Sequence, residues 1–111
     1  MAAWGVGIFD DDLAQNVRKD FQRAVDAGQS VYEAARGILE RYAAANSAVV
    51  YLALAALQLE HGLVQPRIRK TALTVIITGE GVEPWAEAPA ETRAAREREL
   101  DNLRNRLREM G

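Results

Sequence analysis

The sequence contains no cysteine, which excludes disulfide bonds, thiolate metal sites and catalysis by a thiol. Histidine occurs once, at His61, and no H-x-x-x-H or H-E-x-x-H pattern points to a metal-binding helix. Aromatic residues make up only 6% of the chain, and its net charge is −2 with acidic and basic residues interleaved. A nucleic-acid-binding surface is typically basic, often with stacking aromatic side chains. We therefore expect no metal, no cofactor and no nucleic-acid partner.

Long apolar runs are also missing. The most apolar stretch, between Asn46 and Gly62, is shorter than the roughly 20 residues that a bilayer requires, and it contains Gln58 and His61. The amino terminus has no basic region followed by an apolar core, and it turns acidic at Asp10. A secretory signal peptide has a different pattern. The expected location is therefore the cytoplasm, with no membrane partner.

The same stretch, N-S-A-V-V-Y-L-A-L-A-A-L-Q-L-E-H-G, predicts the helix around which the chain is organised. Alanine and leucine favour a helix, Ser47 is the expected N-cap and Gly62 the expected stop. Apolar side chains are spread around the whole circumference, and a helix without a polar face must be covered by its neighbours. With 111 residues, of which 49% are apolar, the chain is expected to form one domain with one core.

Helix signals divide the rest of the chain. The expected fold is an all-α, compact five-helix domain around a buried central helix, with a short extended N-terminal arm at 1–11. Aspartates cap the first helix, Ser30 and Glu33 form a capping box before the second, and Pro66 opens the fourth. A strand over 75–78 is the alternative there, because those residues are all β-branched. The expected helices lie at 12–27, 31–45, 47–61, 66–78 and 90–110.

The carboxyl-terminal part combines an irregular connection with a charged helix. The connection at 80–89 is expected to be anchored into the core by Trp85. Leu100, Leu103 and Leu107 form the apolar seam of the last helix, whereas its first half is almost wholly charged. We expect this first half to be exposed in a monomer and to meet either another protein or a second copy of the chain.

Several motifs together resemble a family of small uncharacterised bacterial proteins that is known only as a domain of unknown function. W-G-V-G-I-F-D-D-D at 4–12 matches the family's opening W-G-x-G-x-F-[DE]-x-D motif. V-Y-L-A-L-A-A-L-Q at 50–58 is similar to its F-W-L-A-L-A-x-x-Q, and A-L-T-V-I-I-T-G at 72–79 matches its A-L-x-V-I-x-x-G, which a tryptophan follows. The resemblance implies a fold and a bacterial origin, but it implies no activity.

Three consecutive carboxylates, Asp10, Asp11 and Asp12, form the first candidate site. Carboxylate oxygens are ligands for Mg²⁺ and Ca²⁺, so a hard-metal site is one interpretation. Consecutive side chains point in different directions, however, and no spaced D-x-D-x-D-G loop follows. Helix capping and favourable negative charge at a helix N-terminus explain the run better.

The second candidate site consists of Trp4, Tyr51 and Gln58. Gln58 follows Tyr51 by seven residues on one face of an apolar helix, and a buried amide without partners costs about 1–3 kcal/mol. We expect the N-terminal arm to plug this region, with Trp4 and Phe9 against the helix and Gln58 bonded to the arm's backbone. The alternative is a small polar pocket that these residues form with the aspartates.

Neither candidate site contains a complete catalytic set. His61 has no serine or cysteine nucleophile at a recognisable spacing. The leading hypothesis is a non-enzymatic small bacterial interaction or regulatory protein, of the immunity type that neutralises a partner by occupying it. The rival hypothesis is a small-ligand or metal-binding, or hydrolytic, protein that uses Asp10, Asp11 and Asp12 with Tyr51 and Gln58.

Overall fold

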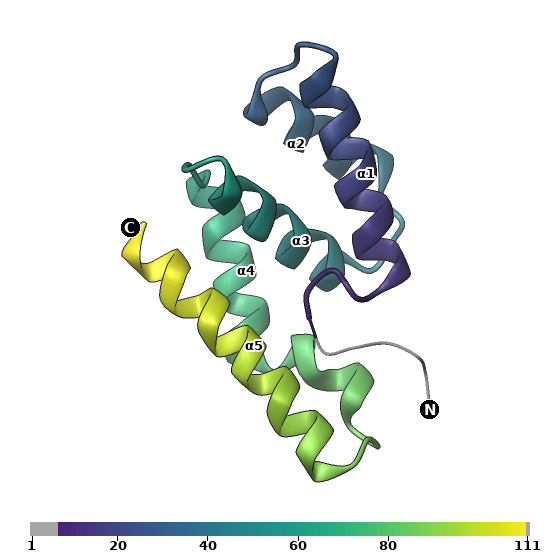
Figure 1. Ribbon diagram of the computed structural model, residues 1–111, viewed down its shortest axis with the longest axis vertical. Helices are drawn as coiled ribbons and strands as arrows, with labels where there is room; N and C mark the ends of the chain where they lie inside the picture. Colours follow the sequence, from purple (N-terminus) through teal and green to yellow (C-terminus); the bar gives the residue numbers. More distant parts are fainter. Residues whose placement is uncertain (1–6, 111) are drawn as a thin grey trace.

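The structure is a computed structural model that describes residues 7–110, and within this range every regular element is a helix, with no strand (Figure 1). The all-α prediction is therefore confirmed at the level of class, and the strand alternative for 75–78 is wrong, because these residues continue a helix. The elements are α1 (Asp12–Asp26), α2 (Val31–Arg41), α3 (Ser47–Glu60), α4 (Pro66–Thr78), the 3₁₀ helix η1 (Glu80–Trp85) and α5 (Ala90–Glu109).

The caps explain most of the helix bounds. Asp11 accepts a hydrogen bond from the N–H of Ala14 at 3.0 Å and so begins α1. The capping box before α2 is present in both directions, between Ser30 and Glu33. The N–H that Ser30 donates lowers the pKa of the Glu33 carboxyl below its ordinary value. Gly79 has φ = +85°, a left-handed conformation that glycine adopts without strain, and it ends α4.

One expected helix bound and one expected N-cap are wrong. Helix α2 ends at Arg41 rather than at 45, and the N-cap of α3 is Asn46 rather than Ser47. The two differences have one cause. Asn46 is extended, and its side-chain oxygen accepts from the N–H groups of Ala48 and Val49, so the chain must leave α2 early to turn into this cap. The connection expected to be irregular also contains the helix η1.

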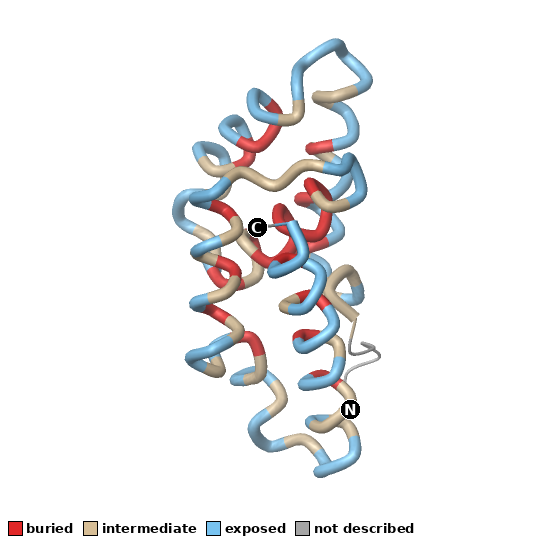
Figure 2. Tube along the Cα trace, turned by 90° about the vertical axis from the view of Figure 1, so that its left-hand side faces the viewer, coloured by how far each residue is buried: buried red, intermediate tan, exposed pale blue. Residues whose placement is uncertain are grey.

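Helix α3 supplies the largest share of the core. Its buried residues include the unbroken run from 52 to 58. It packs most extensively against α1 and α4, and also touches α2, α5 and η1. Figure 2 shows the buried residues on the sides of the helices that face one another. Because α3 has no polar stripe, each of these contacts removes apolar surface from water.

Helix α5 is fixed to the body by its leucines. Leu100, Leu103 and Leu107 are all buried, as expected. The first half of the helix was expected to be exposed, and this is wrong at Arg96, whose side chain is only 5% exposed. In the described range, no helix is both long enough and apolar enough to cross a membrane.

The part of the N-terminal arm that the structure describes lies against the body. Ile8 and Phe9 are partly buried against the core, and the Arg18 guanidinium lies 4.7 Å from the centre of the Phe9 ring. Arg18 also approaches Glu60 at 3.6 Å. Trp4, which was expected to plug α3, lies outside the described residues.

A short hydrogen bond joins α1 to α2. The Tyr42 hydroxyl donates to Asp20 Oδ2 at 2.5 Å, and Arg41 Nε lies 3.6 Å from the same oxygen. The hydrogen bond to the carboxylate raises the pKa of Tyr42, because it stabilises the neutral phenol. Few other polar contacts tie these two helices together in the described range.

We predict that Tyr42→Phe lowers the free energy of unfolding by about 1–2 kcal/mol, because it removes a hydrogen bond to a charged group while keeping the ring. Tyr32→Phe is the matched control. Tyr32 is 53% exposed and its hydroxyl makes no hydrogen bond within residues 7–110, so its loss should change stability little. Urea denaturation of both variants measures the difference, and equal stabilities would contradict the prediction.

Candidate functional site

The three aspartates have different local roles. Asp10 Oδ2 accepts from the N–H of Gly7 at 2.9 Å, and Asp11 caps α1. Asp12 is exposed in the first turn of α1, where a negative charge is favourable. Among residues 7–110, no three acidic, histidine or cysteine side chains come together as a metal would require. Backbone hydrogen bonds and the helix dipole thus account for the run without a bound ion.

Gln58 is fully buried, and both ends of its amide are paired with one residue. Its Oε1 accepts from the backbone N–H of Gln65 at 2.9 Å, and its Nε2 donates to Gln65 Oε1 at 2.8 Å. Gln58 was expected to bond to the backbone of the N-terminal arm. It does bond to backbone, but to that of the turn between α3 and α4. The pair fixes the start of α4, whose N-cap residue is Gln65.

Helix geometry explains why Asp10, in the described part of the arm, lies away from Gln58. The arm residue Asp10 shares a surface hollow with Ala56 and Glu60 of α3. Gln58 lies two residues from each of these, which is a rotation of roughly 200° around the helix. Tyr51, seven residues earlier, shares the face of Gln58 and is partly buried. The structure therefore places Asp10 on the opposite side of α3 from Tyr51 and Gln58.

Arg96 is the buried charge that the sequence analysis missed. Its Nε donates to the carbonyl oxygen of Gly81 at 3.0 Å, and its guanidinium lies 4.3 Å from the centre of the Trp85 ring. Burial lowers the pKa of Arg96, and the charges of Asp11, Glu99 and Asp10 act in the opposite direction. The spacing of the sequence could have predicted this burial. Arg96 precedes Leu100 by four residues, so it lies on the same face of the helix as the leucine seam.

Trp85 was expected to enter the apolar core. Instead it is half-buried, and its ring stacks on Arg96, so it anchors η1 to α5 through a cation–π contact. The cavity beside this pair is about 20 Å³ and is lined by side chains that include Asp11, Asn46 and Glu80. Ligand pockets usually measure about 300–1,000 Å³. The space has room for about one water molecule and is too small for a substrate.

No family model, curated protein or solved structure matches this chain. The resemblance of its motifs to an uncharacterised bacterial family stays a prediction. Any functional argument must therefore start from the geometry and charge of the described residues.

The segment that Arg96 holds is strongly acidic on its outside. Four exposed carboxylates occur between 80 and 91 with no lysine or arginine among them, and we call them the acidic end: Glu80, Glu83, Glu87 and Glu91. In the described part of the chain, none of the four forms an ion pair. Arg93 Nη1 donates to the carbonyl oxygen of Ala86 at 3.3 Å, so two arginines of α5 hold this segment by its backbone rather than by its carboxylates.

His61, the only histidine, is exposed at the end of α3. Its ring centroid lies 5.7 Å from that of Phe21, in a tilted arrangement. This contact covers part of the buried Phe21 ring, and it gives His61 a packing role at the end of the helix.

We predict that Gly81→Ala destabilises the protein by about 1–3 kcal/mol, through overpacking beneath the acidic end. A Cβ atom at Gly81 would lie 2.8 Å from Leu100 Cδ1 and 3.4 Å from Leu52 Cδ1, both on buried side chains. Gly37→Ala is the control, because its Cβ meets no atom within 4 Å and alanine favours the interior of α2 by up to about 1 kcal/mol. The midpoints of thermal and urea unfolding should therefore fall for Gly81→Ala and rise for Gly37→Ala.

We also predict that Gln58→Leu lowers stability by about 1–3 kcal/mol, because it leaves the N–H of Gln65 without its acceptor. Gln15→Leu, on the exposed side of α1, makes the same chemical change where no hydrogen bond is lost and should be nearly neutral. Chemical denaturation of the two variants compares them directly. A small effect at Gln58 would mean that the pair with Gln65 contributes little to the fold.

Proposed function

We propose that the chain is a non-enzymatic interaction protein that binds a basic surface of another protein through its acidic end. The observation that carries this proposal is the exposure of four carboxylates without counter-charges on one short segment. Unpaired surface charge of one sign attracts a partner of the opposite sign and raises the rate of association.

Rigidity is the second reason to assign binding to this segment. Three contacts hold it to the body: the Arg96–Gly81 hydrogen bond, the stacking of Trp85 on Arg96, and the bond from Arg93 to Ala86. Gly81 itself is buried. A surface that is already ordered loses less conformational entropy on binding, so its contacts contribute more fully to affinity.

The rival hypothesis has less support. A metal-binding or hydrolytic site would need Asp10, Asp11 and Asp12 to be available to a ligand together with Tyr51 and Gln58. Two of the aspartates accept backbone hydrogen bonds, and Gln58 is buried and paired with Gln65. Both groups therefore have structural partners already.

Within this proposal, the protein is of the immunity or regulatory type, acts in the bacterial cytoplasm, and neutralises its partner by covering it. Helix α3 would serve as the centre of a five-helix scaffold, a role supported by its burial and by its contacts with all the other elements. That scaffold would hold the acidic end in place while the partner is bound.

Co-purification from the source bacterium, followed by mass spectrometry, tests the proposal. We expect the wild-type chain to retain a basic protein, and the double variant Glu83→Lys/Glu87→Lys to lose it. Glu40→Lys/Glu109→Lys is the control, because it makes the same change in net charge at two exposed positions outside the acidic end and should retain the partner.

Two outcomes would argue against the proposal. One is a partner that both double variants retain equally well, since binding would then use another surface. The other is a bound partner that is acidic. If the expected partner is found, expressing it alone should slow growth, and co-expressing this chain should restore growth, as the immunity role requires.

A further inference from the structure

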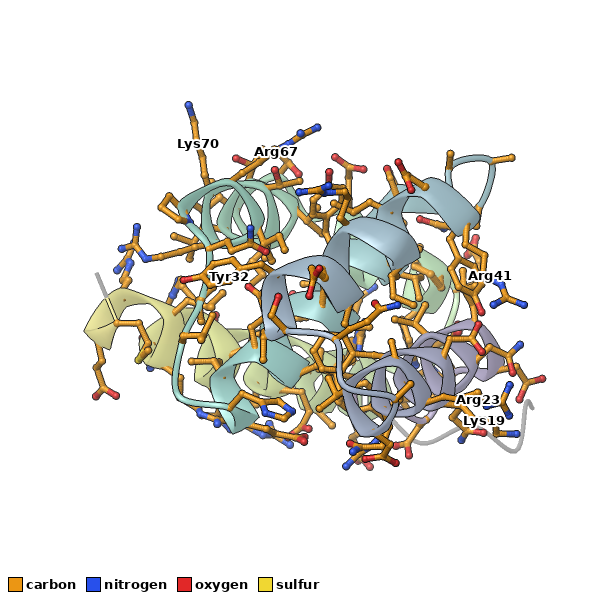
Figure 3. All side chains as sticks on the ribbon, turned by 90° about the horizontal axis from the view of Figure 1, so that it is seen from above. Lys19, Arg23, Tyr32, Arg41, Arg67 and Lys70 are labelled. Carbon is orange, nitrogen blue, oxygen red and sulfur yellow. The ribbon has the colours of Figure 1, made fainter. Side chains whose placement is uncertain are left out.

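One face of α4 is uncovered along the length of the helix. Its exposed residues recur at Arg67, Lys70, Thr74 and Ile77, a spacing that places them in one stripe. Figure 3 shows Arg67 and Lys70 pointing away from the other helices. Ile77 is 68% exposed, more than any other large apolar side chain in the described range. The stripe is therefore basic at its start and apolar at its end.

The apolar end of the stripe opens into a surface groove where α4, η1 and α5 meet. We call it the α4–α5 groove; it measures about 450 Å³. Both of its charged side chains, Glu97 and Asp101, are acidic and exposed on α5. The lining consists of Ile76, Ile77, Gly79, Val82, Glu97, Leu100 and Asp101.

The basic end of the stripe has no counter-charge nearby on its own helix. No aspartate or glutamate occurs between Glu60 and Glu80. Arg69 turns inward and donates from Nε to the carbonyl oxygen of Leu107 at 2.8 Å. Arg67 and Lys70 form no ion pair within residues 7–110. One helix thus displays a basic surface and, beside its other end, an acidic groove with an apolar floor.

We propose that this face is a contact between two copies of the chain, with α4 antiparallel to α4 of the second copy about a two-fold axis near Thr74. Arg67 and Ile77 are ten residues apart, or about 15 Å along the helix. An axis between them places the basic end of each copy against the groove of the other. The Lys70 stem then covers Ile77 while its ammonium group faces Glu97 and Asp101.

Charge complementarity within one chain is the reason to assign a second copy as the occupant. A two-fold contact uses the same patch on both subunits and therefore requires a surface that is complementary to itself. The stripe and the groove meet this requirement, because Arg67 and Lys70 precede Thr74 on α4 while the acidic groove lies beside the residues that follow Thr74. A contact centred on one helix of about 20 Å is small, so the dimer should be weak and sensitive to salt.

The dimer goes beyond the proposed partner binding and does not depend on it. Glu83 and Glu87, which test that function, do not line the groove. Either proposal can therefore fail alone.

Sedimentation velocity from about 10 μM to about 1 mM, the range in which small contacts associate, tests the dimer. We expect the sedimentation coefficient of the wild type to rise toward that of a dimer, and the rise to shrink in about 1 M salt. Ile77→Ser should weaken association, whereas Tyr32→Ser, at another exposed large side chain, should not. A wild type that stays monomeric throughout overturns the proposal and leaves the groove to a foreign basic helix. Growth beyond a dimer overturns the two-fold contact.

A charge exchange between two variants gives the decisive comparison. Arg67→Glu/Lys70→Glu and Glu97→Lys/Asp101→Lys should each self-associate at least about tenfold more weakly than the wild type, because like charges then face each other. Mixed in equal amounts, the two variants should form a mixed dimer, since both charged contacts are then attractive. Circular dichroism should show both variants folded before they are mixed.

The control for non-specific attraction is Glu40→Lys/Glu109→Lys, which has the same net charge as Glu97→Lys/Asp101→Lys. It should not pair with Arg67→Glu/Lys70→Glu. If it pairs as well as the groove variant, or if the two exchange variants fail to pair, the contact proposed here is wrong.

Discussion

Helix α3 has no polar face, and the other elements are arranged so that water is excluded from it. Seven consecutive residues, 52–58, are buried, which requires neighbours on every side of a helix. Helices α1 and α4 cover it most extensively, while α2, α5 and η1 make the remaining contacts.

Two polar side chains enter this apolar interior, and each one orients an adjoining segment. Gln58 accepts a hydrogen bond from the backbone N–H of Gln65 at the start of α4, and Arg96 donates one to the carbonyl oxygen of Gly81 in η1. A buried polar group without a partner is costly, so each pair favours one placement of its segment over the alternatives. The two pairs therefore determine how α4 and η1 leave the core, and with them the surfaces on which both proposals rest.

The surface charge is divided between these two segments. Helix α4 presents Arg67 and Lys70, whereas η1 and the start of α5 present the acidic end. A net charge of −2 conceals this separation, because charges that cancel over the whole chain still produce local fields. An interaction protein with such a surface can meet partners of opposite sign through different faces.

The sequence by itself determined the helical class and most of the helix bounds, because these depend on local physics: apolar periodicity, caps at Asp11, Ser30 and Glu33, and a left-handed glycine at Gly79. It did not reveal that Asn46, rather than Ser47, would be the N-cap of α3. Both residue types are good N-caps, and the choice depends on where the chain turns after α2.

Tertiary structure decided the partners of the polar residues. The sequence indicated that Gln58 must be bonded, but its partner depended on the path of the turn between α3 and α4, which brought Gln65 beside it. Asp10 lies on the opposite side of α3. Arg96 was hidden among charged residues that are mostly exposed, and only the packing of η1 on α5 buried it. The periodicity of a chain shows which side chains share a face, whereas the helix that covers that face is set by the packing of the whole core.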